Sequence, residues 1–265
     1  MAKPILKWAG GKRQIIKEIL AHFPRDYKLR SFHEPMFGAG AVSFEIGPKD
    51  GTINDVNRRL VNLYEVVKEC PEELILFNRR HQHSKEYFYK ARERFNAPVR
   101  GESLDPVEEA SLLIYLNRTC FNGLYRENSS GAFNVPFGRY KTVDFFQEES
   151  IREASMVLGK LEIHNEDFTY VLELARPGDL IYFDPPYHPI SETASFTSYH
   201  MNGFDLKDQE RLRDAMVELH ERGVMVILSN SNAREIRELY SQLDGFTISD
   251  IKAKRAINCN GSKRG

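Results

Sequence analysis

The sequence is poor in cysteine and almost balanced in charge. Three of its 265 residues are cysteines, Cys70, Cys120 and Cys259, and no two of them form a C-x-x-C pair. This spacing argues against a zinc site or a disulfide framework, so we expect reduced, structural thiols in a cytosolic protein. The formal net charge of −1 gives no overall electrostatic argument for a nucleic-acid partner.

Long apolar runs are also missing. No apolar stretch approaches 20 residues, and no charged-then-apolar leader is present, so neither a membrane span nor secretion is predicted. The chain has no internal repeat and no low-complexity segment. Its length allows one large domain, or one core with an insertion.

Basic residues nevertheless gather in two stretches. Positions 117 to 141 contain one acid, Glu127, and four basic residues: Arg118, Arg126, Arg139 and Lys141. Positions 252 to 265 contain no acid and five basic residues: Lys252, Lys254, Arg255, Lys263 and Arg264. Such stretches suit contact with phosphate, although a solvated surface explains them equally well.

The most informative motif is Asp184-Pro185-Pro186-Tyr187, which follows the apolar run at 180 to 183. Open α/β sheets bind ligands at the carboxyl ends of their strands, so this motif is a candidate reaction site. The Asp184 carboxylate and the Pro185 carbonyl can accept hydrogen bonds from a planar amino group, while Tyr187 stacks on the base. The two prolines fix the backbone. The alternative is a proline-rich turn with a packed tyrosine.

A second pattern indicates a nucleotide site near the N-terminus. A strand at 29 to 34 leads into a turn containing Gly38 and Gly40, and a helix begins directly after it. This order is typical of a Rossmann-like site, but Ser43 breaks the G-x-G-x-x-G spacing, which disfavours a dinucleotide. Asp55 ends a second strand and can accept both hydroxyls of a ribose. The set, placed ahead of Asp184, indicates S-adenosylmethionine.

Two further patterns are rejected. Gly10-Gly11-Lys12, ahead of an expected helix at 14 to 22, fails the phosphate-loop pattern because position 6 is leucine and position 13 is arginine. His81 and His83 form the only close histidine pair, and a solvated helix face explains them. We therefore expect no ATP or GTP site and no metal site.

The α/β rhythm is interrupted between residues 58 and 145. Helical periodicity at 60 to 67 and a helix opened by Asp105 indicate a helical insert, whose part from 117 to 140 resembles an exposed loop or hairpin able to enter a groove. The rhythm then resumes with strands at 161 to 164, 224 to 228 and 246 to 251, and helices at 205 to 223 and 233 to 243. The long stretch at 188 to 204 is typical of a lid.

The chain resembles the DNA adenine methyltransferase family, in the alpha arrangement and of the GATC type. The resemblance covers essentially the whole chain. It rests on these motifs: Leu6-Lys7-Trp8-Ala9-Gly10-Gly11-Lys12, Glu34-Pro35 through Gly40, Asn54-Asp55, Tyr115-Leu116-Asn117-Arg118, Phe121-Asn122-Gly123-Leu124, Phe133-Asn134-Val135-Pro136-Phe137-Gly138-Arg139-Tyr140-Lys141, Asp184-Pro185-Pro186-Tyr187 and Phe196-Thr197.

The resemblance implies a Rossmann-like catalytic domain at 1–57 and 146–265, with a helical domain for recognition of duplex DNA inserted at 58–145. It implies that Asp184, Pro185, Pro186 and Tyr187 form the catalytic motif. The residues implied to bind S-adenosylmethionine are Trp8, Lys12, Gly38, Gly40, Asp55, Asp167, Phe168 and Asp184. Those implied to contact DNA are Phe121, Asn122, Arg126, Pro136 and Tyr140, with Arg126 reaching a guanine. The expected reaction is methyl transfer to N6 of an adenine flipped out of the duplex.

The chain departs from the family pattern at three places. Met36 follows Glu-Pro where phenylalanine is usual, and Phe121 replaces the tyrosine of close GATC-specific relatives. The chain also stops soon after Gly261, where relatives continue into a final strand. The recognised sequence, the oligomeric state (a monomer or weak dimer is expected, without an obligate protein partner) and the biological role stay open.

Three rival functions remain at this stage. The same machinery could act on N4 of cytosine or on a glutamine in protein, although enzymes of the second kind usually carry asparagine in place of Asp184. A catalytically silent DNA-binding protein is the third, against which the intact Asp55, Asp184 and Tyr187 speak. Incorporation of methyl groups into DNA separates these functions.

Overall fold

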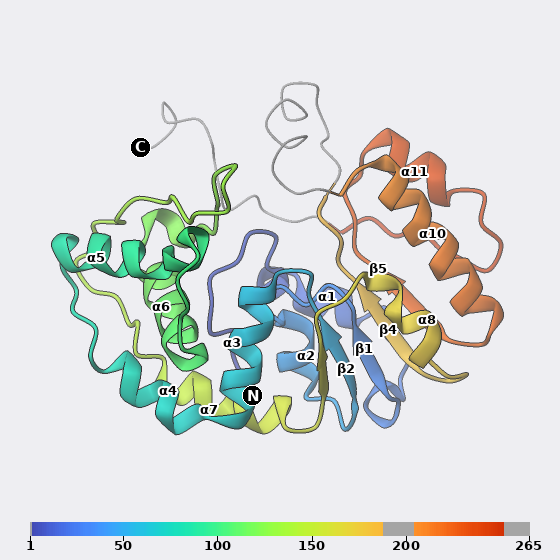
Figure 1. Ribbon diagram of the computed structural model, residues 1–265. Coiled ribbons are helices and arrows are strands. Elements are labelled where there is room, and N and C mark those ends of the chain that lie inside the picture. The colour runs from blue at the N-terminus through green and yellow to red at the C-terminus, as the bar shows by residue number, and fades with distance from the viewer. Residues whose placement is uncertain (1, 188–203, 252–265) are drawn as a thin grey trace.

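The computed structural model describes residues 2–187 and 204–251, and its centre is a parallel sheet (Figure 1). The five strands lie in the order β3-β2-β1-β4-β5, and every adjacent pair is parallel. Their bounds are β1 Phe32–Glu34, β2 Gly51–Asn54, β3 Glu162–His164, β4 Leu180–Phe183 and β5 Met225–Leu228. The predicted α/β Rossmann-like fold class is confirmed.

Helices cover the sheet and form a separate group beside it, where α4, α5 and α6 lie together (Figure 1). The α-helices are α1 Ile16–Leu20, α2 Ala41–Ile46, α3 Arg58–Glu69, α4 Pro71–Asn78, α5 Lys85–Phe95, α6 Pro106–Thr119, α7 Glu148–Leu158, α8 Val171–Leu174, α10 Leu206–Glu221 and α11 Arg234–Tyr240. Asp105 accepts the backbone N–H groups of residues 107 and 108 and so begins α6. Asp205 begins α10 through a reciprocal capping box with Asp208. Both starts were predicted.

Strand β4 lies in the middle of the core because both of its faces are buried. Leu180 and Tyr182 pack with side chains of α1 and α2 on one face, and Ile181 and Phe183 pack with α8, α10 and α11 on the other. Side chains alternate between the faces of a strand, so a continuous apolar run is what a strand covered on both sides requires. The residue that follows Phe183 is thereby delivered to the carboxyl edge of the sheet.

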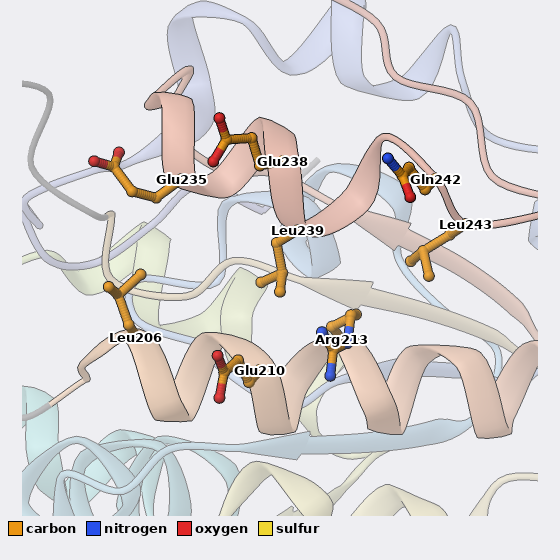
Figure 2. A pocket seen from close by; sticks show the side chains of 8 residues that line it. All are labelled: Leu206, Glu210, Arg213, Glu235, Glu238, Leu239, Gln242 and Leu243. Atoms are coloured by element: carbon orange, nitrogen blue, oxygen red, sulfur yellow. The ribbon is translucent and has the colours of Figure 1, made fainter.

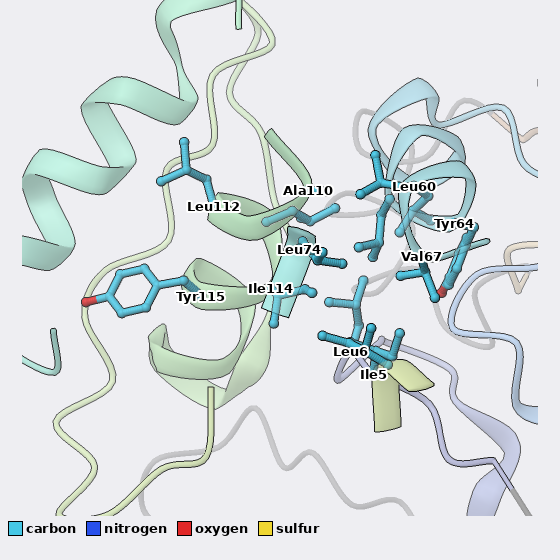
Figure 3. Close-up of a cluster of buried hydrophobic side chains, with 14 of the residues drawn as sticks. Ile5, Leu6, Leu60, Tyr64, Val67, Leu74, Ala110, Leu112, Ile114 and Tyr115 are labelled. Atoms are coloured by element: carbon cyan, nitrogen blue, oxygen red, sulfur yellow. The ribbon is translucent and has the colours of Figure 1, made fainter. Parts of the chain in front are cut away.

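The largest apolar cluster joins the N-terminal segment to the helical group. Figure 3 shows Ile5 and Leu6 packed near side chains of α3, α4 and α6. Helix α3 also contacts α7, so this cluster is continuous across position 58, where the inserted domain was predicted to begin. The division into a catalytic and a recognition domain stays a prediction.

The prediction of a strand at 246 to 251 is wrong. These residues form no strand, and β5 ends the sheet in the part of the chain that the structure describes. The alternating apolar residues pack elsewhere: Phe246 lies 5.0 Å from the His220 ring, and Ile251 packs against the cluster under β4. The helix expected at 14 to 22 is limited to α1, Ile16–Leu20. The strand expected at 29 to 34 is limited to β1, Phe32–Glu34.

Several expectations lie outside the described residues. They are the lid at 188 to 203, the motif Phe196-Thr197, the basic residues from Lys252 to Arg264, and Cys259. Within the described residues, Cys120 is buried and Cys70 is exposed, and both are free thiols. No helix there has the length and apolar character needed to cross a membrane.

Candidate active site

Asp184 follows β4 directly and pairs with Lys12 from the N-terminal loop. Asp184 Oδ1 lies 2.6 Å from Lys12 Nζ, and Lys12 also donates to the carbonyl of Gly10 at 2.7 Å. Lys12 is one partner of this buried oxygen, and a carboxylate has about four lone-pair positions in all. Asp184 therefore keeps acceptor capacity at the end of the strand.

Burial and the ion pair act in opposite directions on these two groups. Burial raises the pKa of Asp184, and the Lys12 ammonium opposes that rise. Burial alone would lower the pKa of Lys12, but the carboxylate of Asp184 outweighs it and the pKa of Lys12 is raised. Lys12 consequently stays protonated at neutral pH and holds a positive charge at a site that is mostly removed from water.

The remaining residues of the motif differ in exposure. Pro185 is buried, and the carbonyl of Pro186 accepts a hydrogen bond from Gln209 of α10 at 3.3 Å. The ring of Tyr187 is 44% exposed, and Lys12 Nζ lies 4.5 Å from its centroid. A cation over one face of the ring leaves the other available for stacking on a base. The alternative of a packed tyrosine is not what the structure has.

The glycine turn after β1 lies against Trp8. Gly38 and Gly40 both have positive φ, +51° and +68°. A Cβ at Gly40 would lie 2.3 Å from the Phe37 ring, and one at Gly38 would lie 3.2 Å from Trp8. Neither position could accept a side chain without a shift of its neighbours, so the turn packs tightly against the rings of Trp8 and Phe37.

Asp55 lies just beyond β2 and fixes that turn. Its Oδ2 accepts the N–H of Gly38 at 2.9 Å, and its Oδ1 accepts the N–H of Asn57 at 2.8 Å. Burial raises the pKa of Asp55, and these two hydrogen bonds oppose the rise. Each oxygen retains a lone pair for a ligand hydroxyl. Asp55 is thus a structural acceptor as well as a candidate ribose ligand.

Asn54, whose importance we did not predict, joins two loops of the site. Its side chain donates to the carbonyls of Pro35 at 2.9 Å and Glu166 at 3.0 Å, and accepts from the N–H of Glu166 at 2.8 Å. The side chain is 1% exposed. A buried amide with three backbone partners fixes its neighbours. The only signal in the sequence was an asparagine directly before a strand-end acid.

Asp167 and Phe168 lie on the neighbouring loop after β3. Asp167 accepts from Thr169 and from Arg211 of α10 at 2.8 Å, so its carboxylate already has partners. The Phe168 ring is buried against Phe183, with centroids 6.4 Å apart. The structure therefore places both residues close to the end of β4, with the ring as part of the core under the site.

The departure at Met36 has a clear structural outcome. Phe37 is buried and packs edge to face with Phe44 at 5.6 Å and Tyr64 at 4.7 Å. Met36 instead packs against the cluster that contains Phe168. The aromatic ring thus supports the glycine turn from the core, while the residue directly after Glu-Pro is a flexible thioether.

Glu34, at the end of β1, is a buried acid for which we predicted no role from the sequence. Both the N–H and the hydroxyl of Ser43 donate to its Oε2, at 3.1 and 2.5 Å. Burial raises the pKa of Glu34 to about 8, against the lowering effect of Ser43 and Lys12 and with a further rise from Asp184. At neutral pH this carboxyl group is largely uncharged, so it does not compete with Asp184 as the ion-pair partner of Lys12.

The candidate DNA-contact residues lie on a hairpin after α6. Isolated antiparallel bridges join Cys120 to Phe137 and Glu127 to Phe133. Phe121 is 39% exposed, and Asn122 and Pro136 are exposed. The prediction of an exposed hairpin in this region is confirmed, and the tip turns at 128 to 131 with three bonds to Asn128 Oδ1.

Arg126 and Tyr140 belong to the same hairpin. Arg126 is exposed, and its Nε donates to Asn134 Oδ1 at 2.7 Å, which restrains the guanidinium across the hairpin. The ring of Tyr140 lies 4.6 Å from Lys7 Nζ. The hairpin therefore contacts the N-terminal segment through this ring and cation.

Asn117, another residue without a predicted role, ties these two segments together. Its Oδ1 accepts the N–H of Lys7 at 2.8 Å, and its Nδ2 donates to the carbonyls of Lys7 at 2.8 Å and Gly123 at 3.1 Å. The side chain is fully buried. The loop before Trp8 is thus held to the hairpin by one amide.

The interpretation of His81 as part of a solvated helix face is wrong. It lies in the loop after α4, where its ring nitrogens bond Tyr87 and Ser111, both at 2.9 Å, and its ring stacks on Tyr115 at 4.5 Å. His83 lies in the same loop as His81 and packs near Phe137 of the hairpin. The residues 2–187 and 204–251 contain no cluster of three or more His, Cys, Asp or Glu suited to a metal ion.

A groove elsewhere on the molecule does not overlap with these residues. It measures about 530 Å³ and lies between α10 and α11 (Figure 2). Its lining includes the leucines 206, 239 and 243 and the carboxylates of Glu210, Glu235 and Glu238. Those carboxylates disfavour phosphate, and none of the predicted site residues lines the groove. The candidate active site therefore stays at the carboxyl ends of β1, β2 and β4.

Comparison with known proteins agrees with this geometry. The family described as D12 class N6 adenine-specific DNA methyltransferase matches residues 8–257. The chain is 42% identical to the type II methyltransferase M1.LlaDCHI of Lactococcus lactis subsp. cremoris over 267 residues, covering 99% of this chain and 92% of the relative. It is 39% identical to the type II methyltransferase M.MjaIII of Methanocaldococcus jannaschii over 279 residues, with 99% and 95% covered.

A third relative is a DNA adenine methylase. The DNA adenine methylase of Escherichia coli (strain K12) is 35% identical over 266 residues, covering 99% of this chain and 91% of the relative. The family match decides between the rival functions in favour of N6 of adenine, and the methyl donor of the family is S-adenosylmethionine. The resemblance to the DNA adenine methyltransferase family is confirmed, while the GATC type stays a prediction, and the chain belongs to the D12 class of N6-adenine-specific DNA methyltransferases.

Proposed function

We propose that this enzyme methylates adenine within GATC, and that Arg126 reads a guanine of that site. The observation that carries the proposal is the position of Arg126 on an exposed, net-basic hairpin, with only its Nε engaged by Asn134. Its two terminal nitrogens make no hydrogen bond within the described residues. A guanidinium oriented in this way matches guanine O6 and N7 in the major groove.

The residues around the glycine turn fit S-adenosylmethionine, which supplies a sulfonium methyl group when bound. Asp55 has acceptor capacity left for the ribose hydroxyls, and the turn that contains Gly38 and Gly40 follows β1 at the same carboxyl edge of the sheet as Asp184. The carboxylate of Asp184, paired with Lys12, has lone pairs left for a ligand. We assign cofactor contacts to Trp8, Lys12, Gly38, Gly40, Asp55, Asp167, Phe168 and Asp184.

The end of β4 then performs the chemistry on the target base. The N6 lone pair of adenine is delocalised into the ring, so the amine is a weak nucleophile. Hydrogen bonds from N6–H to the carboxylate of Asp184 and the carbonyl of Pro185 favour a pyramidal, attacking nitrogen. Tyr187 stacks on the flipped base. The Lys12 ammonium favours the ionised form of Asp184, and the proton released from N6 leaves from the side of these acceptors.

The hairpin and the helical group form the proposed recognition domain, residues 58–145. We infer that Phe121 and Pro136 contact bases or replace the flipped adenine in the stack, and that Asn122 and Tyr140 contact the DNA nearby. Exposure of the first three residues and the cation beside the fourth support this assignment. The enzyme would act as a monomer or weak dimer on the DNA of the cytoplasmic nucleoid.

Mapping of methylated adenines at single-base resolution tests the recognition sequence. The wild-type chain, expressed in cells that lack adenine methylation, should modify GATC and no other tetranucleotide to a comparable extent. Arg126→Ala should relax the choice at one base, a loss of about 1–3 kcal/mol of discrimination. Methylation at a different motif, or an Arg126→Ala enzyme that keeps full selectivity, would refute the assignment while leaving the adenine chemistry intact.

A further inference from the structure

Tyr125 connects the cofactor side of the molecule to the DNA-contact hairpin. Its ring lies against Trp8, with centroids 5.1 Å apart and planes tilted by 31°. Trp8 in turn lies against Gly38, whose N–H is held by Asp55. Arg126 is the next residue in the chain. One ring therefore contacts the wall of the proposed cofactor site and adjoins the proposed guanine contact.

The hydroxyl of Tyr125 closes a second connection to the same place. It donates to Glu127 Oε1, and Arg59 Nη1 lies 4.0 Å from that oxygen. Arg59 is the second residue of α3, which begins after Asn57, and the N–H of Asn57 donates to Asp55 Oδ1. Two series of contacts, which we call routes, thus connect Tyr125 to Asp55. The first passes through Trp8 and Gly38 to Asp55 Oδ2, and the second passes through Glu127, Arg59 and Asn57 to Asp55 Oδ1.

The two routes differ in how firmly they are held. Arg59 is 7% exposed, its Nε lies 3.7 Å from the buried Glu109, and its guanidinium lies 4.1 Å from the Phe95 ring. A buried, paired charge of this kind favours one arrangement. Trp8 and Tyr125 are only half-buried. A ligand against Trp8 can therefore change the position of Tyr125, while Arg59 holds its hydroxyl end.

We propose that Tyr125 is a positioning residue that couples cofactor binding at Trp8 to DNA contact by Arg126. A cofactor that fixes Trp8 orders Tyr125 and pre-orients Arg126, and DNA bound by Arg126 tightens the cofactor site in return, because coupling between two sites is reciprocal. The inference rests on the proposed roles of Trp8 and Arg126.

The test is the ratio of cofactor affinities with and without DNA. Dissociation constants for S-adenosylhomocysteine, which has no methyl group to transfer, are measured alone and with a saturating duplex that carries the methylation site mapped for the wild type. Trp8 is the sole tryptophan of the chain, so its fluorescence reports the binding directly. We expect DNA to tighten binding within the usual range of about 5- to 150-fold.

Three variants and one control decide the assignment. Tyr125→Leu should bring the ratio close to one, and Tyr125→Phe, which keeps the ring and loses the bond to Glu127, should give an intermediate ratio. Glu127→Gln should lower the ratio at least about twofold and serves as the deciding variant if Tyr125→Leu does not fold. Tyr89→Leu removes a ring from the same core without touching Trp8 and should leave the ratio unchanged.

The outcomes separate the coupling from the function on which it rests. A folded Tyr125→Leu protein with the wild-type ratio, or a Glu127→Gln protein with that ratio where Tyr125→Leu is unfolded, overturns the role of Tyr125. Wild-type protein that binds both ligands with a ratio near one overturns the coupling alone. Wild-type protein that fails to bind the duplex overturns the proposed DNA contacts together with the coupling.

Discussion

The site at the end of β4 and the hairpin after α6 differ in the burial and pairing of their cationic side chains. Lys12 is buried and lies 2.6 Å from the carboxylate of Asp184. The hairpin residues Arg126, Arg139 and Lys141 are exposed and have no carboxylate within 4.0 Å in the described part of the chain. Each region contains cations, but only one of them keeps its cation neutralised within the protein.

The difference is what the proposed roles of the two regions require. A charge that assists a reaction has to be in place before the substrate arrives, so its partner is built into the fold. Cations that bind phosphate gain from the release of counterions, and a fixed carboxylate partner would remove that gain. Under these proposed roles, a buried and paired cation is expected at the reaction site, and exposed cations without a carboxylate partner are expected at the DNA surface.

The largest expected effect comes from breaking the pair. Asp184→Ala removes the acceptor for N6 and leaves the buried Lys12 without a carboxylate partner, so turnover should fall at least about a thousandfold. Binding to DNA should persist, because the hairpin is untouched. Radiolabel transfer to a duplex and band-shift titration measure the two quantities, with Asp214→Ala on the surface of α10 as the control. Turnover near the wild-type level would contradict the assignment.

The second prediction concerns the uncharged acid beside the pair. The pKa of Glu34 is about 8 in the folded chain, above its ordinary value of 4.5. Between these pH values the folded chain binds a proton that the unfolded chain has released, so the free energy of unfolding falls as pH rises. Glu34→Gln should remove this dependence, worth on the order of a few kcal/mol.

Urea unfolding at pH 5.5 and at pH 8.5 measures it, on the wild type and on Glu34→Gln. The difference between the two proteins isolates Glu34 from other titrating groups, and Glu18→Gln on exposed α1 is the matched control. Equal pH dependence in the wild type and in Glu34→Gln would show that Glu34 is ionised in the folded protein.

A smaller effect is expected at Asp55. Asp55→Ala leaves ribose hydroxyls unpaired and should weaken binding of S-adenosylmethionine by about 1–3 kcal/mol. Asp55→Asn keeps one acceptor oxygen and should lose less. Calorimetric titration gives the affinities, and circular dichroism checks that the turn at Gly38 has not unfolded the chain. Unchanged affinity in Asp55→Ala would make this residue a structural acceptor only.

The smallest effect belongs to the exposed cations. Lys141→Ala should weaken binding to all duplexes about equally and reduce the slope of log affinity against log salt by about 0.9. Fluorescence anisotropy at several salt concentrations, with site-containing and scrambled duplexes, measures the slope. A change confined to the site-containing duplex would move Lys141 from backbone contact to base readout.

Features that are local in sequence were predicted well. Strand β4 with Asp184 at its end, the glycine turn before α2 and the caps at Asp105 and Asp205 each depend on a few neighbouring residues. The fold class follows from the alternation of such elements. The family resemblance added the assignment of Lys12 and Arg126, which composition and spacing alone do not give.

Features that depend on distant partners were missed or wrong. The environment of His81 is made by Tyr87, Ser111 and Tyr115, and no pattern around position 81 announces them. Residues 246 to 251 have the alternation of a strand, but the contacts they make are with helices: Arg237 of α11 pairs with Asp250 at 2.5 Å, and Phe246 packs near His220 of α10. Asn54 and Asn117 act through backbone groups far along the chain.

The bonds of Asn54 also bear on how the chain folds. Strand β2 is adjacent to β3 in the sheet, yet Asn54 reaches a partner 112 residues later, at Glu166. The sheet can close on this side only after the whole helical insert has been synthesised. The entropic cost of closing a loop grows slowly with its length, by about 0.6 kcal/mol for each doubling, so a longer insert would hardly change stability. Contacts so far apart in sequence slow folding instead, and variation in the insert should therefore appear first in the refolding rate.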